Sequence, residues 1–362
     1  MKINSLKLVN FRNYDKVHLQ FNDTLNIICG NNGEGKTNLV EAIYVLFLTK
    51  SFRPVNEKFL IKKGEVSTRI EGVVEKNTEN NYQVIINKDG KKVKIDNNIS
   101  LKLSDYVTNI KVVILEPDAQ MIFSDSPLNR RRMFNIEISQ IENNYLQYLN
   151  GYNKILKQRN AYLKECFKSN NCNYNYLQIL TEKLIGYGKI IYELRKKFVE
   201  EINPLVSKCY LEMFGFGNLT IKYNSVYNNK TDEDILKIYQ NNYQKEISLN
   251  KTLNGIHHDD FIFLLDKENI NEIGSNGQRK NAILAFKMAE IELIYQKFGD
   301  YPILILDDLF SALDYNKIKN IINLLNRNIQ TFITTTSIEV IDEILLENAK
   351  LYNISDGLIE EV

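Results

Sequence analysis

The first fifty residues alternate between strand-like and helix-like patterns of apolar side chains. Val17, Leu19 and Phe21 alternate with polar neighbours, and residues 25–29 form a short apolar run that ends at a glycine. Both patterns predict β-strands. After Lys36 the apolar residues recur at helical spacing. They are Leu39, Val40, Ile43, Leu46 and Phe47. The segment therefore predicts a strand, a glycine-rich loop and a helix, in that order.

A meander of shorter strands is predicted after this helix. Residues 66–95 alternate apolar and polar positions, and Asp89-Gly90 lies between two of the alternating runs. Such a dipeptide is typical of the two-residue turn of a β-hairpin. This turn predicts a register in which Ile86 lies opposite Val93 and Val84 lies opposite Ile95, with the apolar pairs on one sheet face.

The middle of the chain predicts a helical arm. Ser126-Pro127 fits the cap and first position of a helix that continues to about residue 167. The polar residues 169–175 predict a turn, and a second helical run follows from Leu177 to about Phe214 with a break near Pro204. From about residue 271 helices and apolar strands alternate, which is typical of an α/β sheet.

Composition excludes some classes of protein but does not select one. The 362 residues are 44% hydrophobic and carry 46 basic against 45 acidic side chains. A sizeable core is therefore possible, and nucleic-acid binding must be argued from local patches. Four scattered cysteines without a CxxC pair predict reduced thiols rather than a disulfide or zinc module. Because no apolar run of about 18 residues occurs, we expect a cytoplasmic protein without a membrane segment.

The glycine-rich loop carries a phosphate-binding motif, Gly30-Asn31-Asn32-Gly33-Glu34-Gly35-Lys36-Thr37. It fits G-x-x-x-x-G-K-[ST], in which backbone N–H groups surround the phosphates and the lysine reaches the terminal ones. The N-terminus of the following helix adds partial positive charge. The motif predicts an ATP site formed by these eight residues, in which Lys36 assists catalysis and Thr37 holds Mg²⁺.

A matching acidic motif lies far along the chain. Residues 303–306 form an apolar strand pattern that ends in Asp307 and Asp308. The first acid is expected to complete the Mg²⁺ shell that begins at Thr37, and the second to orient or deprotonate the attacking water. For this segment alone, two solvated acids at a strand end are the simpler interpretation. Together with the phosphate-binding loop, the pattern predicts a Walker B strand.

A third motif, Gly274–Arg279, precedes a predicted helix and resembles the signature loop of ABC ATPases. The residues that carry this resemblance are Ser275, Gly277 and Gln278. In such proteins the loop binds the γ-phosphate held by the opposite subunit, which implies an ATP-dependent homodimer with two shared sites. Asp314 then ends a pattern like the D-loop of the same class. Taken alone, Ser-x-Gly-Gln is a weak signal, whereas four motifs in this order are strong.

Additional segments mark a narrower family. Phe11-Arg12-Asn13-Tyr14 stands before the phosphate-binding loop, as it does in SMC-like DNA-repair ATPases. Further family segments are residues 51–53, 116–118, 126–132, 156–160 and 334–336. In this order they resemble the RecF family of bacterial DNA-repair proteins over about residues 1–340. The resemblance implies an α/β fold, with an ABC-ATPase head of mixed and antiparallel sheet and an inserted helical arm. It also places Arg12 and Asn13 at the nucleotide.

The resemblance divides the chain into three segments. Residues 1–125 would form the N-terminal part of the head, with the phosphate-binding loop and the meander. Residues 126–235 would form the helical arm. Residues 236–362 would form the C-terminal part of the head, with the signature, Walker B and D-loop motifs.

Some residues depart from the family pattern. Where the family has Gly-Pro-His-Arg-Asp-Asp, this chain has Gly255-Ile256-His257-His258-Asp259-Asp260. On an extended strand the last four of these residues, two histidines and two aspartates, would point alternately to opposite faces. We therefore do not expect them to converge on a metal ion. Lys280 stands where arginine is common, and Asp308 where most ABC ATPases have glutamate. From the aspartate and the short arm we form the hypothesis that ATP hydrolysis is slow.

The first half of the predicted arm is locally basic. Residues 126–169 contain eight basic and three acidic side chains, an excess of five. The candidate DNA contacts are Arg130, Arg131, Arg132, Lys157 and Arg159. Tyrosines 145, 148, 152 and 162 interleave with them, and packing between helices is favoured over stacking on bases. A solvated charged face is the alternative interpretation of the basic run.

The resemblance implies a recombination mediator in DNA repair and replication restart. ATP would form the dimer, the dimer would bind gapped or junction DNA, and weak DNA-stimulated hydrolysis would release it. The implied partners are RecR and RecO, with RecA assisted indirectly. An ABC-type ATPase subunit with a role in transport is the main alternative, but it predicts no arm and leaves Arg130–Arg132 unexplained. An SMC-like structural ATPase needs a far longer coiled coil, and a nuclease needs a further acidic metal site.

Overall fold

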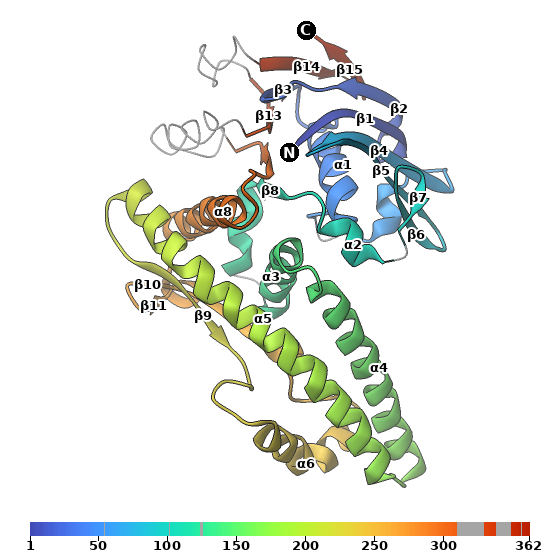
Figure 1. Ribbon diagram of the computed structural model, residues 1–362, viewed down its shortest axis with the longest axis vertical. Coiled ribbons are helices and arrows are strands. Elements are labelled where there is room, and N and C mark those ends of the chain that lie inside the picture. Colours follow the sequence, from blue (N-terminus) through green and yellow to red (C-terminus); the bar gives the residue numbers. More distant parts are fainter. Residues whose placement is uncertain (54, 101, 124–125, 310–328, 338–348, 356) are drawn as a thin grey trace. The chain divides into compact units, whose positions relative to one another are not determined.

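Figure 1 shows the computed structural model, which describes residues 1–362 except 54, 101, 124–125, 310–328, 338–348 and 356. The chain divides into two compact units. One contains residues 1–119 and 283–362, and the other contains residues 120–282. The sequence predicted a first boundary at 125/126 and a second at 235/236. The compact units instead divide at 119/120 and at 282/283. The second division is the more distant from the expectation, because the elements between residues 219 and 273 pack on the helices of the arm.

The first unit contains a six-stranded antiparallel sheet in the order β2-β1-β4-β5-β6-β7. Its strands are β1 (Lys2–Phe11), β2 (Tyr14–Gln20), β4 (Ser67–Glu75), β5 (Glu79–Asn87), β6 (Gly90–Ile95) and β7 (Asn98–Ile99). Burial alternates along β4 and β5, as expected for strands with one face against a core. Short helices accompany the sheet at η1 (Glu57–Leu60) and α2 (Leu103–Val107).

The β5–β6 hairpin differs in register from the sequence prediction. Val84 lies opposite Val93 and Asn87 opposite Gly90, so the turn residues are 88 and 89 rather than 89 and 90. The side-chain oxygen of Asn87 accepts a hydrogen bond of 3.0 Å from the backbone N–H of Asp89, which starts the turn earlier. Since the register moves by two positions, the apolar residues stay on the same face.

A second sheet of the same unit is largely parallel and has the order β15-β14-β3-β13-β12-β8. Its strands are β3 (Leu25–Cys29), β8 (Val112–Leu115), β12 (Ile303–Asp307), β13 (Thr331–Thr335), β14 (Ala349–Ser355) and the antiparallel β15 (Leu358–Glu361). Helix α1 (Lys36–Leu48) packs on strands of both sheets, and 11 of its 13 residues are buried. The predicted order of strand, glycine loop and helix is therefore confirmed.

The second unit is built around a long helical hairpin. Its helices are α3 (Pro127–Ile141), α4 (Tyr145–Ser169), α5 (Tyr174–Phe214), α6 (Asp232–Leu249) and α7 (Ile270–Ile273). The strands are β9 (Leu219–Asn224), β10 (Asp260–Leu265) and β11 (Glu268–Asn269), which form a small antiparallel sheet. The 3₁₀ helix η3 (Ile256–His258) precedes β10, η2 (Pro117–Phe123) precedes α3, and α8 (Asn276–Phe298) follows α7. Within the described residues, no helix is long and apolar enough to cross a membrane.

Two helix predictions need correction. The helix expected from residue 126 to 167 ends at Ile141, and a new helix starts at Tyr145. Conversely, the break expected at Pro204 is absent, because α5 continues through this residue. The side chain of Asn203 bonds both the N–H and the C=O of Ile221, at 2.7 and 3.0 Å. This attachment to β9 holds the helical turn that proline disfavours on its own.

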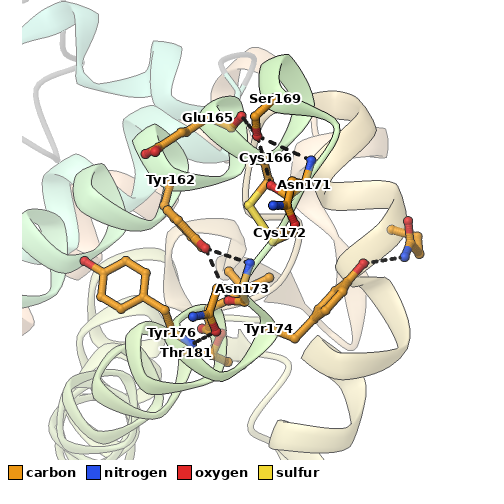
Figure 2. The surroundings of a disulfide bond; sticks show 12 residues. Tyr162, Glu165, Cys166, Ser169, Asn171, Cys172, Asn173, Tyr174, Tyr176 and Thr181 are labelled. Carbon is orange, nitrogen blue, oxygen red and sulfur yellow. Dashed lines mark hydrogen bonds between the residues drawn. A yellow bond between two sulfur atoms is a disulfide. The ribbon is translucent and has the colours of Figure 1, made fainter.

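The prediction that the cysteines are unpaired thiols is also wrong for two of them. Cys166 and Cys172 form a disulfide where α4 ends and α5 is about to begin (Figure 2). The sequence offered no CxxC spacing to indicate this pair. The two residues meet because the chain reverses direction between the two helices, which a spacing rule for metal or redox motifs does not detect.

Candidate functional site

The phosphate-binding loop connects the buried strand β3 to helix α1. The Lys36 ammonium lies over the loop and donates hydrogen bonds of 2.7 Å to Gly30 O and 2.9 Å to Asn31 O. Gly35 has a φ of +121°, and a Cβ there would lie 2.6 Å from Asn13 Nδ2. A side chain at this position would therefore be strained and would collide with its neighbour. The close approach explains why the motif requires glycine before the lysine.

Residues of the segment before the loop hold its backbone in place. The Tyr14 hydroxyl donates to Gly35 O at 3.0 Å, and Asn13 Nδ2 donates to Glu34 O at 3.1 Å. Asn38 Nδ2 in turn donates to Asn13 Oδ1 at 2.9 Å. Burial raises the pKa of Tyr14, so this hydroxyl remains a donor at neutral pH. Asn13 thus lies against the loop, and its contact with the nucleotide stays a prediction.

Arg12 is held by a residue that the sequence analysis did not identify. Its guanidinium bonds the fully buried Glu41 through Nε and Nη2, at 2.8 and 2.7 Å. Ser51 Oγ also donates to Glu41 at 2.5 Å, and Arg53 lies 3.7 Å from the same carboxylate. The cluster joins the start of the chain to α1 and the following loop. Arg12 therefore has a structural role here, and its predicted binding of ATP remains untested.

The two acids of the Walker B strand lie next to the phosphate-binding loop. Asp307 Oδ1 accepts hydrogen bonds from Thr37 Oγ1 at 3.0 Å and from Thr334 Oγ1 at 2.6 Å. Asp307 is 6% exposed, and this burial raises its pKa. The backbone N–H of Asp308 donates to Thr334 Oγ1 at 2.9 Å. Thr334 thus supports both acids. It lies in one of the segments that carry the family resemblance, and its sequence context alone indicates no role.

Sheet topology explains how residues so distant in sequence meet. Strand β13 lies between β3 and β12, and all three are parallel. Their carboxyl ends therefore open at the same edge of the sheet, where ligands of open α/β sheets bind. Thr37 follows β3, Asp307 ends β12 and Thr334 is in β13. The hydroxyl of Thr37 and the carboxylate of Asp307 are hard oxygen donors, which is the ligand type that Mg²⁺ prefers.

The signature-like loop forms the start of α8. Gln278 N–H donates to Ser275 Oγ at 3.2 Å, and Ser275 N–H donates to Gln278 Oε1 at 2.8 Å. This reciprocal pair is a capping box, which satisfies two helix-terminal amides. Ser275, Gly277 and Gln278 are exposed. The capping box accounts for the side chains of Ser275 and Gln278, and contact of the three residues with nucleotide stays a prediction. Asp314 of the predicted D-loop lies outside the described residues.

The basic residues of the arm divide into buried and accessible groups. Arg130 is 5% exposed and bonds both carboxylate oxygens of Asp260, at 2.7 and 2.9 Å. Arg159 is fully buried and pairs with Glu246 at 2.6 Å. Their assignment as DNA contacts is therefore corrected, because neither guanidinium can reach a phosphate without losing its partner. Arg132 and Lys157 are exposed and Arg131 is half-buried.

The tyrosines of the arm follow the same division. Tyr145 and Tyr152 are fully buried, which agrees with packing between helices. Tyr145 Oη accepts from Arg195 at 2.9 Å, and Tyr152 Oη lies 2.6 Å from His257 Nδ1. Tyr162, near the end of α4, remains half-buried. The inner tyrosines thus belong to a polar network of the arm.

The segment that departs from the family pattern enters this network. Ile256–His258 form a 3₁₀ turn, so the expectation of an extended strand is wrong for the two histidines. Asp259 is 2% exposed and accepts from Arg195 at 2.8 Å and from the Tyr223 hydroxyl. Burial lowers the pKa of His257 to about 4, so its imidazole is neutral at pH 7.

Comparison with known proteins places the chain among DNA-repair ATPases. Residues 2–359 match the family described as the RecF/RecN/SMC N terminal domain. The DNA replication and repair protein RecF of Oceanobacillus iheyensis is 38% identical, over 99% of this chain and 100% of its own length. The protein of the same name from Bacillus subtilis strain 168 is 36% identical, with the same two coverages.

Solved structures show the same similarity at the level of the fold. A structure described as the recombination mediator protein RecF-ATP in the RecFOR pathway superposes with a TM-score of 0.92 at 29% identity, covering 99% of this chain and 97% of that chain. An Smc head domain bound to the C-winged helix domain of ScpA has a TM-score of 0.52 at 16% identity, covering 100% and 97%. The latter shows the fold alone.

Proposed function

This chain belongs to the RecF family, and from that premise we propose that it is an ATP-dependent, DNA-binding recombination mediator. Two copies would enclose two ATP molecules, bind gapped DNA or a junction of single and double strands, and help RecA to load. Slow, DNA-stimulated hydrolysis would then release the complex. RecR and RecO would be its partners, as the similarity to a RecF structure of the RecFOR pathway supports.

The observation that carries this proposal is the hydrogen bond of 3.0 Å between Thr37 and Asp307. It joins the phosphate-binding loop to the Walker B strand over a sequence separation of 270 residues. Thr37 and Asp307 would hold Mg²⁺, directly or through water. An ion held there would supply positive charge that offsets the negative charge of the phosphates during phosphoryl transfer.

The remaining residues of the site have separate roles in hydrolysis. Lys36 would move its ammonium from the loop carbonyls to the terminal phosphates, where it stabilises negative charge. The loop amides and the N-terminus of α1 would bind the other phosphate oxygens. Asp308 would orient the attacking water or accept its proton. Its backbone is fixed by Thr334, and its φ of +46° is rare for a residue other than glycine.

Dimerisation would complete the site from the second copy. The serine and glycine of the signature-like loop are exposed at the N-terminus of α8, where the partial positive charge of the helix favours an anion. A single chain carries one phosphate-binding loop and one signature-like loop. A two-fold arrangement would therefore generate two equivalent sites.

DNA would be bound through accessible basic residues of the arm, among which we propose Arg132, Lys157 and Arg131. The first two are exposed and the third is half-buried, with Arg131 Nη1 donating to Asp259 O at 2.7 Å. The matched family is that of RecF, RecN and SMC proteins, and a role in transport gains no support from it.

The test is a measurement of mass by light scattering and of binding to gapped DNA, with and without ATP, at two salt concentrations. Wild type should dimerise and bind DNA with ATP present. Lys36→Met should lose nucleotide binding, and Ser275→Arg should bind ATP yet remain monomeric. Lys63→Met, at an exposed lysine outside the loop, is the matched control and should behave as wild type.

The outcomes separate the parts of the proposal. ATP binding without a dimer at low salt would overturn the shared-site mechanism. A dimer that ignores DNA would leave the ATP switch and refute the role in recombination. Replacement of Arg132 and Lys157 by alanine should lower the slope of log K against log salt by about 0.9 for each lost phosphate contact.

A further inference from the structure

Two cysteines meet at the end of the helical arm, where α4 ends and α5 is about to begin (Figure 2). Cys166 and Cys172 are bonded through their sulfur atoms, with their Cα atoms 4.7 Å apart. This Cα separation lies within the usual range for disulfides. We propose that the pair is a reversible oxidation site, at which hydrogen peroxide converts two thiols into the disulfide. The proposal is independent of the ATP and DNA functions.

The turn between the helices is held in shape by contacts other than the sulfur–sulfur bond. The Ser169 hydroxyl lies 2.9 Å from both Glu165 O and Asn171 O and can donate its one proton to either. Asn173 N–H donates to the Tyr162 hydroxyl at 2.9 Å, and Figure 2 shows this phenol reaching back to the turn. These bonds require no oxidation. They would hold the reduced thiols close together, so that the disulfide forms without refolding.

The α5 side of the turn is fixed in the same way. The Asn173 side chain accepts from Tyr176 N–H at 3.1 Å and caps the helix. The rings of Tyr162 and Tyr176 are in edge contact, with their centroids 4.7 Å apart. Cys172 directly precedes this cap. Its backbone is therefore positioned by the cap on one side and by the turn on the other.

The two sulfur atoms have unequal surroundings, which gives the reaction a direction. Cys166 lies in the last turn of α4 and is 2% exposed. The partial negative charge of a helix C-terminus disfavours a thiolate there. Cys172 is half-exposed and precedes the N-terminus of the 41-residue helix α5, whose partial positive charge favours a thiolate. Cys172 should therefore react first, and Cys166 should resolve the product.

The chemistry balances in two steps. The Cys172 thiolate attacks one oxygen of hydrogen peroxide, which breaks the O–O bond and gives a sulfenic acid and hydroxide. The Cys166 thiolate then attacks the Cys172 sulfur and displaces hydroxide, so that the S–S bond forms. The two hydroxides take up the two thiol protons and leave as water. The sulfur pair loses two electrons, and a dithiol reductant returns them.

Formation of the disulfide would cross-link the last turn of α4 to the residue before the cap of α5. Opening of the turn would then require strain in a covalent ring as well as loss of hydrogen bonds. We expect slower hydrogen exchange at the backbone amides of residues 170–176 after oxidation. The phosphate-binding loop and Asp307 belong to the other compact unit, so the affinity of a single chain for ATP should not change.

The experiment uses the full chain with Cys29→Ser and Cys209→Ser, which leaves the Cys166–Cys172 pair. After reduction and removal of the reductant, one equivalent of peroxide should lower the intact mass by about 2 Da, the two hydrogens lost on disulfide formation. Dithiothreitol should reverse this change. With Cys166→Ser added, dimedone should trap the sulfenic acid of Cys172. With Cys172→Ser added instead, labelling should be at least about tenfold slower, since reactivity follows thiolate character and exposure.

Two results would overturn the inference. One is the absence of an intramolecular disulfide in the folded background protein. The other is equal dimedone labelling of the two single-cysteine variants when both are folded. Equal labelling is expected only in urea, where the helix ends that distinguish the two thiols are lost. If a serine variant fails to fold, alkylation of the reduced wild type by iodoacetamide, followed by peptide mapping, decides the matter. Cys172 should then be modified about tenfold faster than Cys166.

Discussion

The buried ion pair between Arg159 and Glu246 allows a quantitative test of whether Arg159 supports the fold or binds DNA. Both side chains are 0% exposed, and their closest atoms, Nη2 and Oε2, are 2.6 Å apart. Arg159 also bonds Thr181 and Thr252, at 3.0 and 2.7 Å. Glu246 Oε1 accepts from Leu253 N–H at 2.8 Å. All polar partners of the pair therefore lie inside the arm.

Glu246→Gln removes the negative charge and leaves the guanidinium buried without a counter-ion. Breaking a buried pair in this way costs about 3–5 kcal/mol. With a urea slope of about 2 kcal/mol per molar, the midpoint of unfolding should fall by about 2 M. Arg159→Met with Glu246→Met removes both charges, and this double variant should recover most of the loss.

The assay is urea unfolding of the full chain, followed by circular dichroism. Glu212→Gln is the matched control, because Glu212 pairs with Lys208 at 3.8 Å with both side chains more than 60% exposed. Its cost should be about 0.3–0.5 kcal/mol. If Glu246→Gln unfolds like wild type while gapped-DNA binding falls, Arg159 is a DNA contact and the interpretation of the buried pair is wrong.

Three further outcomes are expected. Burial lowers the pKa of Lys111 to about 7, below the value of about 10.4 in the unfolded chain. The unfolded chain therefore binds the extra proton, and the free energy of unfolding should rise from pH 7 to pH 9. Urea unfolding of Lys111→Met at both pH values should show a smaller rise. Thr334→Val removes a hydroxyl that donates to Asp307. It should lower the free energy of unfolding by about 1.5–3 kcal/mol, and it should slow ATP hydrolysis. Gly255→Ala should destabilise the protein by more than about 1 kcal/mol, because φ is +124° and a Cβ would lie 2.4 Å from a buried phenol oxygen. Gly186 lies in a helix with open space around it, so Gly186→Ala should stabilise the protein by about 0.5–1 kcal/mol in the same denaturation assay.

The geometry of the candidate nucleotide site was the most predictable part of the molecule, because its residue types follow from local requirements. A glycine is needed at position 35 because the backbone there approaches Asn13 closely. An acid is needed at the end of β12 because it lies beside the threonine hydroxyl with which it would hold Mg²⁺. Sequence order then gives the sheet edge on which they meet. Glu41 was not predictable in the same way. It looks like any helical glutamate until the fold brings Arg12 and Ser51 to it.

The arm shows where sequence patterns mislead. The helical spacing of charged residues does not distinguish Lys157, which faces solvent, from Arg159, which is enclosed by α6 and the loop at Thr252. Pro204 breaks a helix by propensity, yet attachment to β9 overrides that preference. The hairpin turn was displaced because a side chain, that of Asn87, satisfied a backbone donor first. In each case a tertiary or side-chain contact outweighs the local signal.

The position of β3 in its sheet has a consequence for the synthesis of the protein. Both of its neighbours, β13 and β14, come from residues 331–355, whereas the phosphate-binding loop is made near residue 30. While the ribosome is still making the arm, the strand that carries the loop has neither of its final neighbours, and Thr37 has no Asp307 to meet. A nascent chain should therefore be unable to hold ATP tightly until its C-terminal strands have emerged, and chaperones would meet an exposed apolar strand for most of translation.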